Sequence, residues 1–461
     1  MSTQCKSTAR SAALVVVALA AAAAARADFQ AALRDYNSGH YDTAHAQFLA
    51  LAELGDCSSQ FNLGAMALKG QGGPQDNGSG VGWLEAANSN GCQQLVGDKL
   101  AALTSRLSPA ESQAAAQIVG RYGHDALHAQ GVIDPDFTCH DTTPAHVASM
   151  PLPEYPQQEA ARRQSAIVVT ALTIGADGHA RDPEILLSVP ADGFAAAAVE
   201  AWLNSQFTPA LRNGRAVPSR LPAKHVFALE GGQPLADAEA FRRARPGADT
   251  GDPAAEYLVG LTATVDASLG IPSARAGQLL LGAARDGNAQ AQYWIGSELR
   301  ATAACHPQAD GSVWLRHAAD GGSAAAQLVR ASDLLAGAPS ATQVGEARAL
   351  LHQAAASDSY YVQKHVVALL AASPLAAVRD PAAAQSVALK LAAGEIRSDP
   401  QMYEALAAAD AANGDFQNAV AQQQRALHKA QSLGWDTRVM SERMAAYRAG
   451  RAWQGDLFAS S

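Results

Sequence analysis

Residues 59–73 read SQFNLGAMALKGQGG, and residues 80–91 read GVGWLEAANSNG. In the first stretch, Phe61, Leu63 and Met66 stand among small residues, which predicts a helix whose apolar side packs closely on a neighbour. The glycines within residues 70–73 predict a tight turn with positive φ. Trp83 then begins the apolar face of a second, returning helix. The two stretches therefore predict one pair of helices.

A corner of glycine and small polar residues recurs at nearly constant spacing. Gly55-Asp56 and Asn90-Gly91 each end a helical segment, and their glycines are 36 residues apart (91 − 55). The same corner returns at intervals of 36, 35 and 35 residues, at Gly251-Asp252, Gly287-Asn288, Gly322-Ser323 and Ser357-Asp358-Ser359. Such a period, with two helices per unit, is typical of a helix-pair solenoid. We expect four large aromatic residues to pack between its helices: Trp83, Tyr293, Trp294 and Trp314.

Residues 155–229 interrupt the helical pattern. A proline-rich lead-in at residues 147–156 opposes helix. The sequence AIVVTALTI at residues 166–174 is rich in β-branched residues and predicts a strand. Asp177-Gly178 predicts a hairpin turn to a returning strand. In chain order we expect a short helix, two strands, a helix and a last strand, at residues 157–164, 166–174, 184–189, 195–207 and 223–229.

The N-terminus is typical of an export signal. Lys6 and Arg10 precede an apolar run at residues 11–25, and Ala25-Arg26-Ala27 fits a cleavage site ahead of Asp28. The alternative is an uncleaved membrane anchor. As a helix, however, that run would span only about 22 Å, whereas a hydrocarbon core is about 30 Å thick. We expect cleavage after Ala27 and a product outside the cytoplasm.

The net charge argues against one class of partner, nucleic acid, and the cysteine content bears on whether the chain forms disulfides. Cleavage removes three basic residues, so the formal net charge moves from −9 to −12 (31 basic against 43 acidic residues). An acidic chain without a basic cluster is a poor partner for nucleic acid. The cysteines that remain are Cys57, Cys92, Cys139 and Cys305, and they permit three disulfide connectivities. Cys57 and Cys92 stand at matching ends of one repeat and are the first pair to consider; four buried thiols are the alternative.

The sequence contains no convincing catalytic set. The densest polar group is Asp134, Asp136, Cys139, His140, Asp141 and His146. Cys139, His140 and His146 are zinc-type ligands, but their spacing matches no closed zinc site, which favours a surface loop. His124 and His128 share a helix face without a third ligand nearby. There is no G-x-S-x-G motif and no phosphate-binding glycine loop. We therefore expect no catalytic residue, metal, cofactor or small-molecule substrate.

The repeats resemble the Sel1-like branch of the tetratricopeptide family. The resemblance rests on Phe61-x-Leu63-Gly64, Trp83-x-x-x-Ala87 and Gly91, and on the series of corners after Gly251. The unit at residues 403–427 resembles an ordinary tetratricopeptide ending, and a helix at Asp436–Ala449 would cap the stack. The resemblance implies that the repeats bind partners along a concave face and carry no chemistry.

The strand-rich island resembles the TonB C-terminal domain of Gram-negative energy transducers. Its markers are Tyr155-Pro156, Asp177-Gly178, Phe207-x-Pro209-Ala210, Asn213-Gly214 and Val226-Phe227-x-Leu229. In that family the last strand forms the sheet edge that pairs with a short peptide of an outer-membrane receptor. The resemblance therefore implies partner-binding residues at Tyr155, Pro156, Lys224, His225, Val226, Phe227, Ala228 and Leu229.

Upstream, the chain departs from such transducers. They keep an anchor helix with a functional histidine, and residues 11–25 contain none. They also carry a long proline-rich spacer, whereas the segment before Tyr155 reads as folded repeat. Leu152 and Pro153 stand where a Gln-Pro pair is usual. We expect a chain that keeps the binding sheet and lacks the energy-coupling parts.

The interpretation is a mostly α chain in which helix-pair solenoid blocks flank a small α+β domain with a three-stranded antiparallel sheet. Its expected parts are a signal peptide at 1–27, repeats at 28–130, a linker at 131–150, the TonB C-terminal-like domain at 151–232, and repeats with a capping helix at 233–461. The first functional hypothesis is a non-catalytic periplasmic protein that binds an envelope partner peptide by strand addition, in a TonB-like role in outer-membrane transport. The second is a scaffold that binds through the solenoid groove, with a purely structural sheet. An enzyme is the third.

Overall fold

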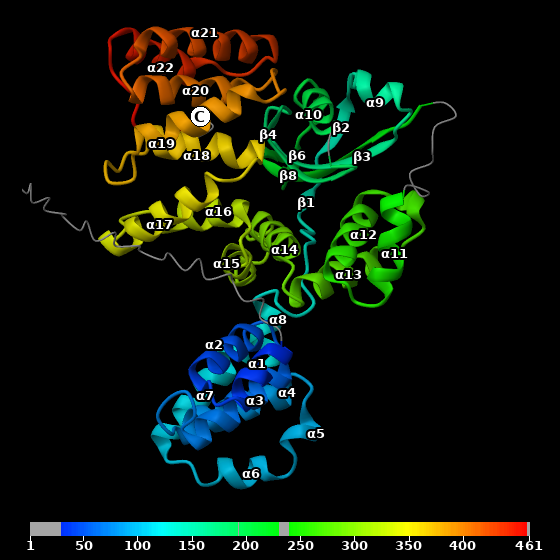
Figure 1. Ribbon diagram of the computed structural model, residues 1–461, viewed down its shortest axis with the longest axis vertical. Coiled ribbons are helices and arrows are strands. Elements are labelled where there is room, and N and C mark those ends of the chain that lie inside the picture. Colours follow the sequence, from blue (N-terminus) through cyan, green and yellow to red (C-terminus); the bar gives the residue numbers. More distant parts are fainter. Residues whose placement is uncertain (1–28, 192, 230–238, 459–461) are drawn as a thin grey trace, which may run out of the picture.

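The computed structural model describes residues 29–191, 193–229 and 239–458. The expected export signal at residues 1–27 lies outside these ranges. Within them, no helix has both the length and the apolar character needed to cross a membrane. Figure 1 shows helical blocks at both ends of the chain and small sheets between them.

The N-terminal block is helical throughout. Its helices are α1 (Phe29–Asn37), α2 (Tyr41–Ala52), α3 (Cys57–Lys69), α4 (Asn77–Ser89), α5 (Gln93–Val96), α6 (Lys99–Thr104), α7 (Pro109–Tyr122) and α8 (His124–Ala129).

The C-terminal block continues the pairing of helices and confirms the predicted solenoid. Its elements are α11 (Glu239–Asp249), α12 (Pro253–Val265), the short 3₁₀ helix η2 (Ala267–Leu269), α13 (Ser273–Arg285), α14 (Ala289–Ala301), α15 (Ser312–Asp320), α16 (Ala324–Leu334), α17 (Ala341–Ala354), α18 (Tyr360–Ala372), α19 (Pro381–Ala393), α20 (Pro400–Ala412), α21 (Phe416–Ser432) and α22 (Arg438–Arg448).

The recurring corner has a simple physical basis. Gly287 ends a helix with φ of +85°, a left-handed conformation that glycine adopts without strain. The next residue, Asn288, caps α14 by accepting hydrogen bonds from the backbone N–H groups of Gln290 and Ala291. Gly55 and Asp56 do the same ahead of α3. The corner thus stops one helix and starts the next, which fixes the repeat length.

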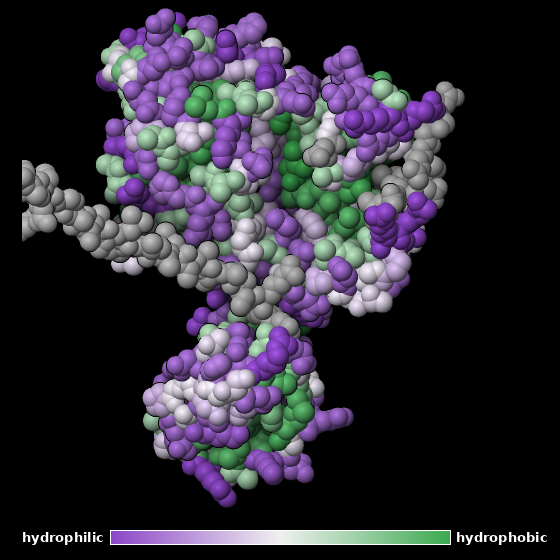
Figure 2. All heavy atoms as spheres, in the orientation of Figure 1, coloured by the Kyte–Doolittle hydropathy of each residue, from purple (hydrophilic) through white to green (hydrophobic). Residues whose placement is uncertain are grey.

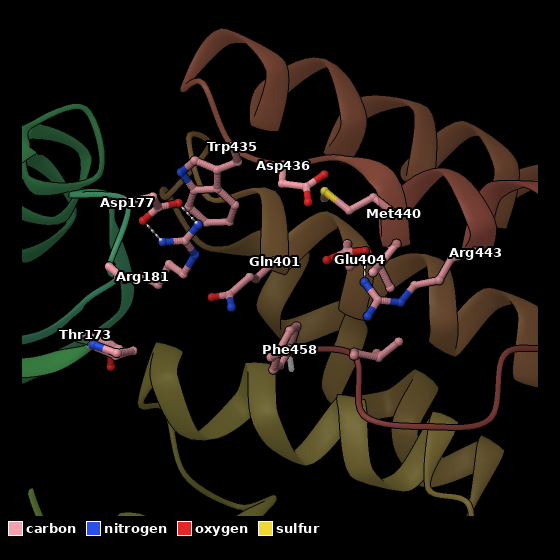
Figure 3. Close-up of a pocket in the computed structure, with 15 residues that line it drawn as sticks. Thr173, Asp177, Arg181, Gln401, Glu404, Trp435, Asp436, Met440, Arg443 and Phe458 are labelled. Atoms are coloured by element: carbon pink, nitrogen blue, oxygen red, sulfur yellow. Dashed lines mark hydrogen bonds and ion pairs between the residues drawn. The ribbon is translucent and has the colours of Figure 1, made fainter. Parts of the chain in front are cut away.

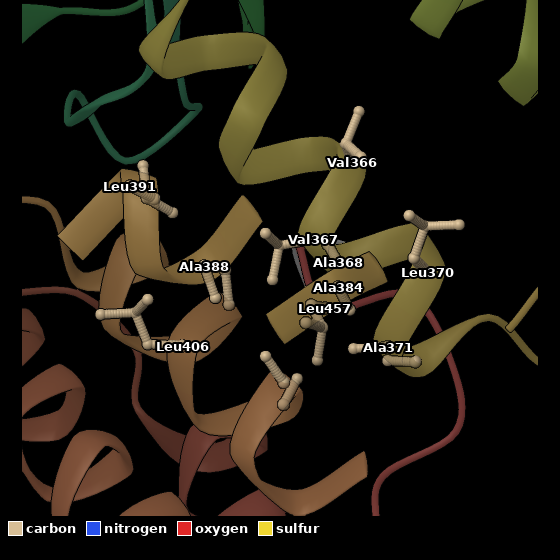
Figure 4. Close-up of a cluster of buried hydrophobic side chains, with 14 of the residues drawn as sticks. Val366, Val367, Ala368, Leu370, Ala371, Ala384, Ala388, Leu391, Leu406 and Leu457 are labelled. Carbon is tan, nitrogen blue, oxygen red and sulfur yellow. The ribbon is translucent and has the colours of Figure 1, made fainter. Parts of the chain in front are cut away.

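Close helix contacts and alanine-rich cores hold the pairs together. A Cβ on Gly64 of α3 would lie 2.9 Å from the carbonyl oxygen of Gly80 in α4, so only glycine allows this approach. Figure 4 shows part of the largest core, where Val367 of α18, Ala388 of α19 and Leu406 of α20 belong to one buried cluster. Trp83, Tyr293, Trp294 and Trp314 are all buried, as the sequence predicted.

The sheet region contains two helices and several short strands. Its elements are β1 (Thr142–Thr143), β2 (His146–Ser149), α9 (Gln157–Ala161), β3 (Ala166–Ile174), β4 (Ala180–Val189), α10 (Ala195–Leu203), β5 (Gln206–Thr208), β6 (Ala210–Arg212), β7 (Arg215–Val217) and β8 (Ser219–Phe227). The main sheet has the antiparallel order β4-β3-β8. This confirms the three-stranded sheet, and β3 has the predicted bounds.

Both faces of β3 are covered, which explains its uninterrupted apolar sequence. Val168 points to one face and packs with Phe194 and with Ala198 of α10. Ile167 and Val169 point to the other face and share a core with residues of α12, α13 and α14. The sheet therefore lies between α10 and the C-terminal solenoid (Figure 1).

Several sequence-based boundaries differ from the structure. β4 begins at Ala180 and not at residue 184, and α9 ends at Ala161 and not at residue 164. The last strand was expected at 223–229, but β8 begins at Ser219 because it pairs along the whole of β3, and it ends at Phe227. The helix expected to reach residue 207 ends at Leu203, since Phe207 pairs with Val147 in a strand. The expected linker at 131–150 contains β1 and β2, which pair with β6 and β5.

Candidate functional site: the free edge of the sheet

The predicted partner-binding residues do not share one environment. Tyr155 and Phe227 meet in an aromatic cluster with Phe194, with ring centroids 4.9 to 5.7 Å apart. The Tyr155 hydroxyl also donates to the carbonyl of Gln164, which ties the lead-in to the start of β3. Phe194 and Phe227 are almost fully buried. These rings hold the domain together, and of the three only Tyr155 remains partly exposed.

β8 is an edge strand whose outer side is unpaired within the described ranges. Every residue of β8 pairs with β3, from Ser219 opposite Ile174 to Phe227 opposite Ala166. On its other side, no backbone hydrogen bond joins β8 to another described segment. This row of unpaired N–H and C=O groups is the feature that strand addition uses.

Pro222 reveals which groups of β8 face outward. Proline has no N–H, so a paired edge strand accepts it where the nitrogen points away from the neighbouring strand. Groups two residues apart point the same way, which places the N–H groups of Lys224 and Val226 on the open side. By the same spacing the N–H of Arg220 also faces outward, so Pro222 interrupts a row of donors formed by Arg220, Lys224 and Val226.

The side chains along this edge are partly exposed. Val226 is 37% exposed, Ala228 is exposed, and Leu229 is half-buried. His225 points to the α10 face, where it lies between Trp202 and Phe227, and burial lowers the pKa of its imidazole. Figure 2 shows hydrophobic residues gathered between the sheet and the α11–α13 helices, flanked by hydrophilic ones. The edge therefore has an apolar surrounding as well as free backbone groups.

The solenoid holds the inner face of the sheet through a buried ion cluster. Arg220 of β8 bonds Glu298 of α14 at 2.9 Å and Glu184 of β4 at 3.1 Å. Burial raises the pKa of Glu298, and the Arg220 guanidinium only partly offsets this. Nearby, the Tyr257 hydroxyl of α12 donates to the carbonyl of Leu186 in β4 at 3.0 Å. One cation between two carboxylates thus connects three elements.

Further ion pairs hold the sheet at β8 and at β4. Lys224 of β8 contacts Asp266, beside η2, at 2.7 Å. At the opposite strand, Asp182 of β4 lies 3.1 Å from Lys364 and 3.0 Å from His365, both in α18. Lys364 is fully buried and also bonds Asp399 at 3.0 Å. The first helices of three pairs, α12, α14 and α18, therefore hold the sheet.

Two disulfides account for the four cysteines of the described chain. Cys57 and Cys92 are bonded within one repeat, with Cα atoms 5.6 Å apart, which is the pair considered first from sequence. Cys139 and Cys305 are bonded across 166 residues and tie the segment before β1 to the loop after α14. Cys139, Asp141 and Cys305 offer donor atoms close together, but both sulfurs are spent in the disulfide. His124 and His128 are both exposed on α8.

Two further groups of residues support this arrangement and were missed in the sequence: three charged residues and a repeated glutamine. Asp182, Lys364 and Asp399 come from three separate elements, and each looks like an ordinary surface charge in the sequence. Gln60 and Gln292 sit four residues after a helix cap, and each donates from its side-chain amide to a carbonyl of the preceding helix, Ala52 or Ala284. The glutamine recurs with the same period as the glycine corners, and this recurrence could have been recognised in the sequence.

A known protein family matches the part of the chain that contains the sheets. Residues 151–229 match the family described as Gram-negative bacterial TonB protein C-terminal, which confirms the resemblance seen in the sequence. None of the curated proteins matches the chain. One similar solved structure is c5321, a protective antigen present in uropathogenic Escherichia coli strains displaying an SLR fold. That alignment has 15% identity and a TM-score of 0.30, and it covers 94% of this chain and 88% of the other.

Proposed function

We propose that this protein binds an extended peptide of another cell-envelope protein by strand addition to the outer edge of β8. The observation that carries the proposal is the unpaired edge of β8 at Lys224 to Phe227, where no backbone hydrogen bond joins the strand to another described segment on its outer side. Main-chain hydrogen bonds would supply affinity, and the pockets beside alternate residues would supply specificity.

The family match supports the partner class. A TonB C-terminal domain points to protein interaction in a Gram-negative envelope. An exported, periplasmic location fits the signal-like N-terminus, and the disulfides Cys57–Cys92 and Cys139–Cys305 fit an oxidising compartment. An outer-membrane receptor peptide and a TonB-like role in outer-membrane transport are the specific form of this proposal. It requires no cofactor and no catalysis.

The scaffold hypothesis receives partial support. It required the sheet to pack against the repeats, and Ile167 and Val169 do share a core with the solenoid. However, it also placed partner binding in the solenoid groove, and in the C-terminal block the sheet itself occupies the side lined by α12, α14 and α18. We therefore favour the strand edge over that groove.

Backbone substitution combined with site-specific crosslinking tests the edge. A photo-crosslinking amino acid at exposed Ala228 should form an adduct with an envelope protein in living cells, identified by mass spectrometry. Val226→Pro removes the outward N–H while leaving the ladder to β3 intact, so the adduct should fall to background. Val226→Ala is the matched control because it trims the same side chain and keeps the N–H.

Two results would contradict the proposal. One is an adduct at Ala228 that persists in Val226→Pro at wild-type yield. The other is the same adduct formed equally well from exposed Leu389 of α19, which lies on the C-terminal block and not on the sheet. Circular dichroism of Val226→Pro should match the wild type, which separates lost binding from lost folding.

A further inference from the structure

Several helix corners of the repeats carry a second recurring residue, a glutamine placed four residues after the capping residue. Its side-chain amide donates to a carbonyl at or just beyond the end of the preceding helix. The donors and acceptors are Gln60 and Ala52, Gln292 and Ala284, Gln327 and Ala319, and Gln363 and Ser357. The last carbonyls of a helix have no partner within it, so each glutamine satisfies one of them.

The corner ahead of α12 has a glutamate at this position instead. Asp252 caps α12, and Glu256 follows four residues later. Ala248, in the last turn of α11, stands eight residues before Glu256, as the accepting alanines do before their glutamines. An ionised carboxylate has no proton to donate, whereas a protonated carboxyl has one O–H donor. Glu256 can therefore make the glutamine's bond only while it holds a proton.

A second amide of the first repeat is also replaced by a carboxyl here. Asn90, which follows α4, donates from its side chain to Oε1 of Gln60 at 2.9 Å. Asp286, which follows α13, has the same spacing from Glu256 as Asn90 has from Gln60 (286 − 256 = 90 − 60). Two carboxyls thus occupy the positions at which the first repeat joins two amides by a hydrogen bond. They repel each other when both are ionised.

Glu256 also differs from the other buried glutamates in the part of the chain that the structure describes. It is 9% exposed, and its Oε2 has no hydrogen-bond partner among those residues. Each of the others bonds an arginine, in the pairs Glu53–Arg316, Glu184–Arg220 and Glu404–Arg443, the last of which is drawn in Figure 3. The Glu256 carboxyl instead lies against the backbone of Gly282 in α13, which supplies no charge.

The surroundings of Glu256 disfavour its ionised form on balance. Burial raises the pKa of its carboxyl, and Asp286 raises it further. Arg275 of α13 lowers that pKa, but its guanidinium is exposed and also lies 3.8 Å from Asp249 of α11. Asp252 adds to the rise. The pKa of Glu256 therefore stays above the usual value for a glutamate.

We propose that Glu256 makes the attachment of α11 depend on a proton: the protonated carboxyl donates to the carbonyl of Ala248 and holds the end of α11 on α12, and ionisation weakens that contact. The two helices pack side by side beneath the sheet (Figure 1). Phe241 of α11 is buried in the core that also contains Ile167 and Val169 of β3. One support of the sheet therefore weakens as the pH rises, whether or not β8 binds a strand.

Attachment of α11 should be strongest in mild acid. A carboxyl whose folded-state pKa lies above its unfolded value adds stability below the unfolded value, and this is lost as the pH rises through the folded-state pKa. Carboxylates that are ionised in the folded state and paired with a cation have the opposite dependence. The direction of the effect therefore distinguishes Glu256 from the paired glutamates.

Hydrogen–deuterium exchange of the intact protein, read by mass spectrometry at about pH 4.5 and about pH 7.5, measures this attachment. Protection of the α11 amides, relative to their intrinsic exchange rates at each pH, should fall severalfold in the wild type at the higher pH. Glu256→Gln supplies the amide found at the other corners, so protection of α11 should be equal at both pH values. Glu395→Gln, the same exchange at an exposed site after α19, is the matched control and should behave as the wild type does.

The reverse exchange tests whether the position itself is sufficient. Gln292→Glu should make protection at the end of α13 fall at the higher pH, while α11 keeps its own dependence on Glu256. Retention of the full pH-dependent loss of α11 protection in Glu256→Gln would assign that loss to another group and overturn the proposal. So would protection of wild-type α11 that stays constant or grows as the pH rises.

Discussion

Lys364 illustrates what single residues contribute to this architecture. Its side chain has no exposed surface, and its ammonium contacts Asp182, Asp399 and the Gln401 amide oxygen within 3.1 Å. A buried cation of this kind adds little net stability when paired, yet removing one partner is strongly destabilising, by about 3–5 kcal/mol. The cluster joins β4 to α18 and α20, so its main effect is to fix where the sheet sits.

The same cluster predicts an acid-sensitive attachment of the sheet. Burial raises the pKa of Asp182, but Lys364 and His365 outweigh it and hold that pKa well below its usual value near 3.8. A lowered folded-state pKa contributes stability above the unfolded value, and this is lost as the pH falls through the folded-state pKa. We therefore expect Asp182→Asn to lower the free energy of unfolding at about pH 7, with a smaller difference at about pH 3.

Urea denaturation at both pH values measures this effect. Exposed Asp358→Asn is the control and should leave the free energy of unfolding close to that of the wild type at either pH. A difference between wild type and Asp182→Asn that stays constant, or that grows on acidification, would show that the Asp182 carboxylate does not contribute in its ionised form.

At the scale of elements, glycines with different neighbours should respond in opposite ways. A Cβ on Gly296 of α14 would lie 2.7 Å from Leu315 and 3.1 Å from the carbonyl of Gly311, so Gly296→Ala should destabilise by about 1–3 kcal/mol. Gly277 of α13 is exposed and has open space around it, so Gly277→Ala should stabilise by about 0.5–1 kcal/mol. Thermal unfolding of both variants gives the comparison. Shifts of the same sign would refute the close packing of α14 on α15.

Local signals explain which elements could be predicted. β3 was found with its observed bounds because nine consecutive residues favour a strand, and the helix corners were found because glycine and a capping residue must be adjacent. β1 and β2 escaped prediction because they are two and four residues long and pair with strands far downstream. The start of β8 was also missed, because the prolines at 218 and 222 argue locally against a strand. Pairing with β3, which lies far away in the sequence, outweighs that preference.

The candidate site, too, has features that a local sequence signal predicts and features that depend on residues far apart in the chain. The family motif located the β8 edge, but it could not show that Phe227 is a core residue with Tyr155 packed against it, since that depends on Phe194. Nor could it show what covers the inner face. His365 and Asp182 are 183 residues apart, and Cys139 and Cys305 are 166 apart. Such pairs depend on how the solenoid curves, and no local pattern encodes that.

At the scale of the whole molecule, the sheet and the C-terminal solenoid share one core. Ile167, Val169 and Val189 of the sheet are buried together with Leu261 and Trp294 of the solenoid. Each large aliphatic side chain that is fully buried contributes about 1.5–3 kcal/mol relative to an exposed one. A domain of this size has little stability to spare. The sheet therefore depends on the solenoid for one of its two faces.

This dependence predicts the behaviour of fragments. Residues 131–232 alone should show a broad, weak urea transition and bind hydrophobic dyes, because Ile167, Val169 and Val189 lose their cover. A longer fragment, residues 131–461, keeps the cover, the Arg220–Glu298 pair and the Cys139–Cys305 disulfide, and it should unfold cooperatively. A cooperative transition of the short fragment at the same urea concentration as the long one would show the sheet to be self-sufficient. The solenoid would then be a neighbour of the binding edge and not the support that keeps it in place.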